Sequence, residues 1–299
     1  MCKQTTKFRF AFDEQRTITM SSGYLCIAQN GEHDYLRMAY LQALSCKLTQ
    51  QYVTNFSVIV DKETAEQVTD EHRAVFDQVI VLKHDLAANS KIKMQNECQV
   101  FNYSPYKRTI KTECDMLFTT NLDWLWYTYN PFTYSFTQSV YTYDGLVIDN
   151  RKYRQQFDDN LLPNIYSAWT YFTYDTACKE IYDTMRVIID DWAWFRDNYL
   201  VNCRYDEPRT DEVYALALKI LDIKPHDTGF GFVHMKSELQ RCFSKQPWQE
   251  QLNWDIQPDF IPVIGHYKQI RPLHYVEKTF VTDEILDRYE YEFNARRNC

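Results

Sequence analysis

The sequence predicts an α/β fold with a mostly parallel central sheet. Over the first ~115 residues, short apolar runs typical of buried strands alternate with longer segments that carry apolar residues at helical spacing. Because helical crossovers join neighbouring parallel strands, this order favours a sheet covered by helices on both faces. The expected strands cover residues 24–28, 56–60, 76–82 and 108–112.

Helices are expected between these strands. The clearest covers residues 34–48, where apolar side chains recur every three or four positions. Two more are expected over residues 64–75 and 90–103. The second of these ends before Pro105, since proline cannot continue a helix.

The second half of the chain is less periodic and rich in aromatic residues. We expect helices near residues 164–180, 180–194 and 211–221, followed by a loop-rich tail from Lys224. The sequence has no internal repeat, low-complexity segment or evident linker. Residues 1–299 are therefore expected to form a single domain.

Composition and charge argue against several classes of protein. The net charge of −8 disfavours tight non-specific binding to nucleic acid, although Lys236, Arg241 and Lys245 leave a local basic face open. The nine cysteines include no C-x-x-C pair, which argues against a disulfide framework and against a zinc site. No stretch approaches the ~20 apolar residues of a membrane span, and the N-terminus lacks a secretory signal. We expect a cytoplasmic protein.

Two carboxylates, Glu113 and Asp115, follow the fourth expected strand. Their acidic-x-acidic spacing carries no weight alone, because the chain has four such triplets and about five are expected by chance. Their position does carry weight, since ligands bind at the carboxyl ends of parallel strands and residues i and i+2 of an extended segment point to one side. Such an oxygen site suits Mg²⁺ or Mn²⁺ bound together with substrate phosphates. The alternative is a solvated strand end with two exposed acids.

The segment around this pair resembles the GT-A glycosyltransferases. The stretch Ser104-Pro-Tyr-Lys-Arg-Thr-Ile-Lys-Thr-Glu-Cys-Asp-Met-Leu-Phe118 is similar to the region of their D-x-D motif, particularly in glycogenin-like nucleotide-diphospho-sugar transferases and their bacteriophage-encoded counterparts. Glu113 replaces the first aspartate of that motif. The resemblance implies a single GT-A domain, with residues 23–120 as the nucleotide-sugar-binding half and residues 121–299 as the acceptor-side half and tail.

The implied activity is metal-dependent transfer of a sugar from a nucleotide-sugar donor, a UDP-sugar, to a hydroxyl acceptor. Glu113 and Asp115 would hold Mn²⁺ or Mg²⁺, and a late histidine would complete the metal shell. His234 is expected in that role, with His274 as the alternative. The acceptor is open. Hydroxymethylated bases of phage DNA are one option, which would place the protein in the host cytoplasm, and a glycan or protein is the other.

The resemblance also implies where the nucleotide binds. The stretch from Gly23 to Asn30 is similar to the first strand of the family, whose end contacts the nucleotide, so Ala28, Gln29 and Asn30 are candidate nucleotide-binding residues. Asp61 joins them because it follows the second expected strand.

Four further residues are candidates for the phosphate and sugar ends of the donor. Lys236 resembles the lysine that meets the diphosphate in the family, and Lys91 lies where a basic side chain could reach phosphates. Asp211 and Glu212 resemble an acidic helix start near the donor sugar, where one of them could act as a base. Helix capping is the alternative explanation of this acidic start, and a solvated helix face that of Lys91.

Two other classes of protein remain as lower-ranked alternatives. A nucleotidyltransferase usually has a glycine-rich phosphate loop after the first strand, whereas here Gly31 is followed by Glu32. A non-catalytic nucleotide-sugar-binding protein would share the fold but not the metal dependence.

Lys111, in a strand expected to be buried, either leans toward the acidic pair as a counter-ion or indicates that its strand is near an edge.

Overall fold

The computed structural model describes residue 18 and residues 20–90, 93–148, 154–203, 205–235 and 247–297. A six-stranded sheet in the order β3-β2-β1-β4-β8-β6 forms its centre. Four of its strands are parallel neighbours and correspond to the four that the sequence predicts: β1 (Met20–Ala28), β2 (Phe56–Val60), β3 (Gln78–Val81) and β4 (Tyr106–Thr112).

The first half of the chain confirms the expected alternation. Helix α1 (Tyr35–Thr49) begins where the Asp34 side chain accepts a hydrogen bond from the Arg37 N–H. The helices expected over 64–75 and 90–103 are each divided. The first forms α2 (Lys62–Ala65) and α3 (Asp70–Val75), and the second forms the 3₁₀ helix η1 (Lys93–Gln99) and α4 (Val100–Tyr103).

The helix expected over residues 164–180 is wrong. The first part of that segment is β8 (Tyr166–Thr173), an antiparallel strand between β4 and β6 (Tyr134–Thr137), and a helix begins only at Thr176. It is buried on both faces, so its apolar run lacks the alternation that distinguishes a strand from a buried helix. Helices α7 (Thr176–Asp190), α8 (Trp192–Tyr199) and α9 (Thr210–Ile220) follow, close to the later helices that the sequence predicts.

The tail is far more regular than expected. Strands β9 (Gly231–His234) and β13 (Leu273–His274) join β5 (Met116–Leu117) and β7 (Ser139–Tyr141) in a second sheet of order β5-β13-β9-β7. The second half of the chain also contains a third sheet and four short helices: β10 (Trp254–Ile256), β11 (Pro262–Ile264), β12 (Tyr267–Lys268), α5 (Trp124–Thr128), α6 (Gln155–Asp159), α11 (Trp248–Gln251) and η3 (Lys278–Phe280).

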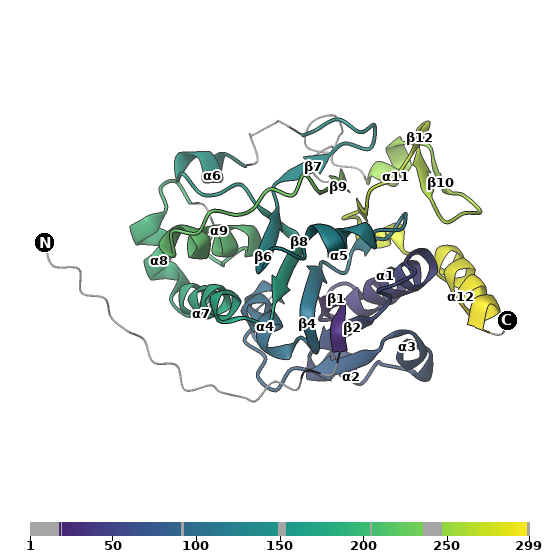
Figure 1. Ribbon diagram of the computed structural model, residues 1–299, viewed down its shortest axis with the longest axis horizontal. Coiled ribbons are helices and arrows are strands. Elements are labelled where there is room, and N and C mark those ends of the chain that lie inside the picture. Colours follow the sequence, from purple (N-terminus) through teal and green to yellow (C-terminus); the bar gives the residue numbers. More distant parts are fainter. Residues whose placement is uncertain are drawn as a thin grey trace, which may run out of the picture.

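Helix α12 (Asp283–Arg297) ends the described chain and covers α1 (Figure 1). Arg37 of α1 pairs with Asp283 at 2.6 Å, and Arg296 donates to the carbonyl of Leu48 at the end of α1. Because α12 covers its outer face, α1 is buried on most of its surface. None of the described helices is both long enough and apolar enough to cross a membrane.

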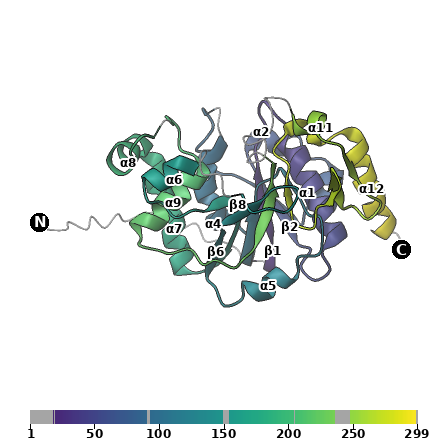
Figure 2. The same ribbon diagram turned by 90° about the horizontal axis from the view of Figure 1, so that it is seen from above.

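The central sheet separates two hydrophobic clusters. Tyr24 and Cys26 of β1 face the cluster that contains α1 and the second sheet, whereas Leu25 faces the cluster that contains α7 and α9. Figure 2 shows α7 and α9 on one side of the sheet and α1 and α12 on the other. This double cover explains why β2 and the carboxyl half of β1 are mainly apolar, and it leaves the carboxyl end of β4 beside the second sheet.

Candidate active site

The acidic pair lies where β4 leaves the central sheet and the chain enters the second sheet. The Glu113 N–H donates to the carbonyl of Ala168 at 3.0 Å, so the pairing with β8 continues through Glu113. The carbonyl of Asp115 accepts from the N–H of Tyr275 at 3.2 Å, which ties the pair to the chain leaving β13. Three segments distant in sequence therefore meet at this point.

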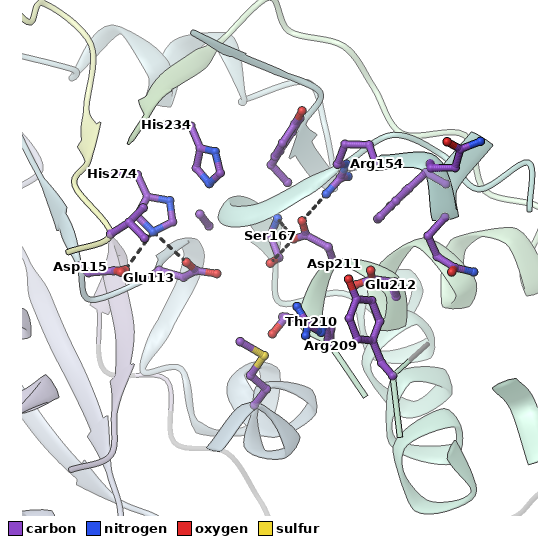
Figure 3. A pocket seen from close by; sticks show the side chains of 18 of the residues that line it. Glu113, Asp115, Arg154, Ser167, Arg209, Thr210, Asp211, Glu212, His234 and His274 are labelled. Carbon is purple, nitrogen blue, oxygen red and sulfur yellow. Dashed lines mark hydrogen bonds and ion pairs between the residues drawn. The ribbon is translucent and has the colours of Figure 1, made fainter. Parts of the chain in front are cut away.

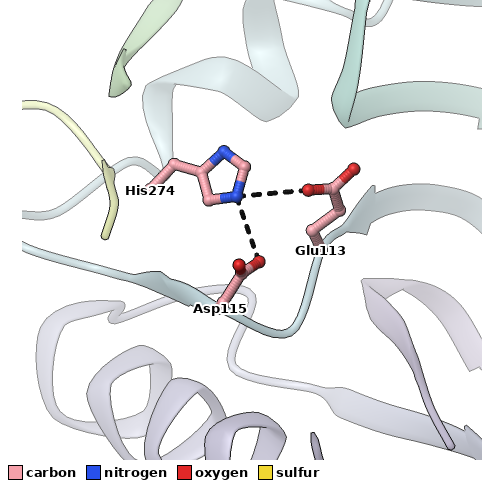
Figure 4. A group of neighbouring side chains, drawn as sticks. All are labelled: Glu113, Asp115 and His274. Atoms are coloured by element: carbon pink, nitrogen blue, oxygen red, sulfur yellow. Dashed lines mark hydrogen bonds and ion pairs between the residues drawn. The ribbon is translucent and has the colours of Figure 1, made fainter. Parts of the chain in front are cut away.

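Glu113, Asp115 and His274 form one cluster of potential metal ligands (Figure 4). The His274 Nε2 atom lies 3.1 Å from an Asp115 oxygen and 3.2 Å from a Glu113 oxygen. The three ligand atoms are within 4.8 Å of one another, and within the described ranges no other group of three His, Cys, Asp or Glu side chains converges this way. Lys278 donates to the second Asp115 oxygen at 2.5 Å.

Opposite charges dominate the electrostatics of this cluster. Burial alone would raise the pKa of Asp115, but His274 and Lys278 outweigh it and hold that pKa well below its usual range. Burial would lower the pKa of His274, but the Asp115 and Glu113 carboxylates raise it to about 9. The pKa of Lys278 is likewise raised by Asp115 against the effect of burial. A protonated imidazole thus holds the carboxylates together, and a cation would have to displace its proton.

The ligand cluster contains the alternative histidine, His274, and not His234. The two histidines are direct partners on adjacent strands, with ring centroids 5.0 Å apart. In the sheet order β5-β13-β9, however, β13 lies next to the strand that follows Asp115, and β9 is one strand further away. His234 faces the same cavity from the outer position. Lys236 lies outside the described residues.

A cavity of about 1060 Å³ extends from this cluster to a second polar group around Asp211 (Figure 3). One Asp211 oxygen pairs with Arg154 at 2.5 Å, and the other accepts from the N–H and hydroxyl of Ser167 at 2.8 and 2.6 Å. Burial would raise the pKa of Asp211, but Arg154 and Ser167 lower it overall. Asp211 is therefore an ionised carboxylate that Arg154 and Ser167 fix in place, and its role is not limited to the start of the helix.

Glu212 lies next to Asp211 at the start of α9 and also lines the cavity. It is buried, and burial together with the neighbouring charge of Asp211 raises its pKa to about 7. A carboxyl group with such a pKa can take up or release a proton near neutral pH. The two carboxylates expected near the donor sugar therefore differ in character, one held ionised and one able to change its protonation state.

The residues expected to contact the nucleotide lie at the ends of β1 and β2, in a buried polar network. The Gln29 side chain donates to Asp61 at 3.1 Å and accepts from Asn96 at 2.9 Å, while Asp61 also caps α2. Asn30 accepts from the Leu36 N–H at 2.8 Å. Ala28 is fully buried. None of these four candidates, Ala28, Gln29, Asn30 and Asp61, is among the described residues that line the cavity.

Lys91 lies outside the described residues. The neighbouring Lys93 donates to the carbonyl of Ala87 at 3.0 Å, so it packs against the loop before η1.

Sequence reasoning missed three residues that the cavity brings forward. Lys278 lies four positions after His274, and this short spacing between a histidine and a lysine is the sequence signal that could have indicated Lys278. Arg154 and Ser167 had no signal, because each gains its role only by contact with Asp211.

The sequence matches no protein-family model and no curated protein, but solved structures share its fold. The apo form of mouse xyloside xylosyltransferase 1 superposes with a TM-score of 0.51 at 12% identity, covering 88% of this chain and 100% of that one. The galactosyltransferase LgtC, in complex with donor and acceptor sugar analogues, gives 0.52 at 11% identity, covering 90% of this chain and 95% of LgtC. The chain therefore has the α/β fold of GT-A glycosyltransferases, as the sequence predicts.

Proposed function

We propose that this chain is a metal-dependent glycosyltransferase that moves a sugar from a nucleotide-sugar donor to a hydroxyl acceptor. The observation that carries the proposal is the cluster of Glu113, Asp115 and His274, which lies at the carboxyl end of β4 and opens into a large cavity. The likeness of the fold to a xylosyltransferase and a galactosyltransferase supports the same class. Fold alone would not justify it, because one fold hosts many functions.

The donor set fits a divalent cation. Two carboxylates and an imidazole suit Mn²⁺, and Mg²⁺ would bind with fewer protein ligands and more water. Glu113, Asp115 and His274 would hold the ion, which when bound neutralises the charge that develops on the departing nucleoside diphosphate. Lys278 lies beside Asp115, where its ammonium can contact the diphosphate.

At the other end of the cavity, Asp211 is proposed to bind the sugar and Glu212 to activate the acceptor. Asp211, ionised and held by Arg154, can accept hydrogen bonds from sugar hydroxyls. Glu212 is the candidate base for the acceptor hydroxyl, since its pKa of about 7 matches that task. Arg154 orients Asp211 and need not touch substrate.

The nucleoside is proposed to lie toward the ends of β1 and β2, beyond Tyr35, which lines the donor end of the cavity. Lys278 lies 5.1 Å from the centre of the Tyr35 ring, so a base stacked on Tyr35 would place its diphosphate near Lys278. Gln29 and Asp61 are buried and bonded to each other, so among these expected contacts the half-buried Asn30 is proposed to reach the base. A UDP-sugar is accordingly the first donor to test.

The charge of the cavity favours an uncharged hydroxyl acceptor such as a glycan or glycoside. Its described lining has three Lys or Arg side chains, Arg154, Arg209 and Lys278, and two of them already pair with Asp211 and Asp115. A polyphosphate backbone needs several basic side chains that are available to its phosphates. Hydroxymethylated DNA is therefore the second candidate acceptor, and a protein hydroxyl the third.

A donor screen tests the proposal. Purified protein is incubated with UDP-, GDP-, CMP- and dTDP-sugars, with and without Mn²⁺, and both donor hydrolysis and thermal stabilisation are measured. We expect Mn²⁺-dependent turnover of one donor class. Binding without turnover would indicate a non-catalytic binding protein. Release of pyrophosphate from a nucleoside triphosphate and a sugar phosphate would indicate a nucleotidyltransferase.

With the donor known, the acceptor is tested in three arms. Simple glycosides, hydroxymethylcytosine DNA beside plain DNA, and an unfolded protein mixture are each offered with radiolabelled donor. Transfer to glycosides supports the charge argument. Transfer to hydroxymethylated DNA alone would overturn it while keeping the proposed activity.

A further inference from the structure

Lys111 carries a charged group buried in the middle of the central sheet. It lies on β4 between Leu25 of β1 and Thr170 of β8 and is 1% exposed. The expectation that its strand might be near an edge is therefore wrong, because β4 is internal in the strand order. An unpaired buried charge costs on the order of several kcal/mol, so its partners reveal why it is kept.

The ion-pair partner of Lys111 is Glu97, not the acidic pair at the end of its own strand. The Lys111 Nζ atom lies 2.5 Å from a Glu97 oxygen, and both side chains are buried. That oxygen also accepts from the Tyr214 hydroxyl at 3.1 Å, and the Tyr214 hydroxyl lies 3.0 Å from that of Tyr182. A buried polar chain thus joins β4 to η1, α9 and α7.

The same lysine also reaches the sugar end of the cavity through one residue. Lys111 donates to the carbonyl of Ser167 at 3.4 Å. The N–H and hydroxyl of Ser167 hold Asp211 at 2.8 and 2.6 Å. The backbone of β8 at Ser167 is therefore shared between the buried ammonium and the carboxylate that faces the cavity.

Lys111 is related to the metal end through its own strand. Glu113 is two residues further on, and because the pairing with β8 continues to Glu113, both side chains project from the same face. The Glu113 N–H donates to the carbonyl of Ala168 at 3.0 Å, next to the Ser167 carbonyl that Lys111 contacts. Lys111 therefore supports the same stretch of β8 that contacts both ends of the site.

We propose that Lys111 is a positioning residue: Glu97 orients its ammonium, which fixes the backbone of β8 at Ser167 and Ala168, and this backbone holds Asp211 and Glu113 on opposite sides of the cavity. It touches neither metal nor substrate. This inference rests on the proposed metal site, and it goes further by giving a function to a buried ion pair that packing alone would not require. An apolar pair of similar volume would be equally stable in a purely structural role.

The test separates positioning from stability with two variants. Lys111→Met removes the ammonium and leaves Glu97 unpaired, so both thermal stability and Mn²⁺ affinity should fall. The double variant Lys111→Met/Glu97→Gln has no buried charge, and its amide oxygen can still accept from Tyr214. Its thermal midpoint in EDTA should return toward that of the wild type. Its Mn²⁺ dissociation constant should stay raised by about tenfold or more, as for other residues that orient metal ligands.

Lys47→Met is the matched control. Lys47 pairs with Asp77 at 2.7 Å, at the amino end of β3 and so at the opposite edge of the sheet. It should alter stability and leave the Mn²⁺ dissociation constant, measured by calorimetric titration, within about twofold of the wild type.

Each outcome bears on one claim. Recovery of wild-type Mn²⁺ affinity in the double variant would overturn the positioning role, since Lys111 would then only neutralise Glu97. If neither variant folds, Lys111→Arg, which keeps the charge, should retain affinity, and a loss there would also overturn it. A wild-type protein that does not bind Mn²⁺ would overturn the metal site itself, together with this inference.

Discussion

The Nε2 atom of His274 lies 3.1 Å from an oxygen of Asp115, although 159 residues separate the two in the chain. The contact exists because β13 pairs with β5, the short strand that directly follows Asp115. It joins an acidic motif that the first half of the chain supplies to a histidine from the tail. The proposed metal site therefore depends on how the tail folds back, and the predictions below test its parts.

Removing one carboxylate should abolish tight metal binding. In Asp115→Asn we expect the Mn²⁺ dissociation constant to rise by more than about a hundredfold, because even outer-shell changes typically cost 10–100-fold. Calorimetric titration measures it. Glu290→Gln/Glu292→Gln is the matched control, since this second acidic-x-acidic pair lies on α12, away from the cavity. Equal effects in both variants would contradict the assigned ligands.

The two histidines should differ in their effect on the metal. His274→Ala removes a proposed ligand and should weaken Mn²⁺ binding by more than about tenfold, whereas His234→Ala should change it by less than about threefold. Binding isotherms of the two variants, measured side by side at pH 8, decide between them. The reverse ranking would show that β9, and not β13, supplies the ligand.

Stability of the metal-free protein should fall at alkaline pH. His274 has a pKa of about 9 in the folded protein against 6.5 when unfolded, so its charged contacts stabilise fully below pH 6.5 and are lost as pH rises toward 9. Over this pH range the free energy of unfolding should fall by on the order of 3 kcal/mol. Urea unfolding in EDTA at several pH values measures it, and His274→Gln should remove most of the dependence.

Metal affinity should change with pH in the opposite direction. Since Mn²⁺ must displace the His274 proton, binding should tighten as pH rises from 6.5 to 9 and should release a proton. Titrations in buffers of different ionisation enthalpy report that proton. A pH-independent dissociation constant would argue against His274 as a ligand.

Glu212 should set the acid limb of the pH–rate profile. If its carboxylate is the base, kcat should rise through about pH 7 as Glu212 loses its proton. Glu212→Gln should remove that limb and lower kcat by about 10²–10⁴-fold. Glu207→Gln, in the connection before α9, is the control and should retain both. An unchanged limb in Glu212→Gln would assign the base elsewhere.

Gly23 should be intolerant of a side chain for a purely steric reason. A methyl group there would lie 2.4 Å from the ring of Tyr106, which is fully buried and bonded to Ser57. Gly23→Ala should destabilise the protein by about 1–3 kcal/mol. Gly31→Ala, which has open space, should change it by about 1 kcal/mol at most. Chemical denaturation measures both.

The regular first half of the fold was predictable because its signals are local. Strands β1 to β3 contain short apolar runs followed by polar residues, and Asp34, which caps α1, is the first residue of the expected helix. β4 is more polar and includes Lys111. β8 was mistaken for a helix because a strand buried on both faces has no alternating pattern. α12 was missed because most of its residues are polar and only Ile285 and Tyr289 are buried.

The sequence by itself determined the four parallel strands along the chain and the position of Glu113 and Asp115 at a strand end, since both depend on neighbouring residues. Only the tertiary structure brings His274, and not His234, against the acidic pair. Both histidines end short strands and are register partners, but β13 lies against β5 and β9 lies one strand beyond. One strand spacing is about 4.8 Å, which exceeds any metal–ligand bond, so the strand order makes His274 the expected ligand. Pairing between strands far apart in the chain leaves no local signal in either one.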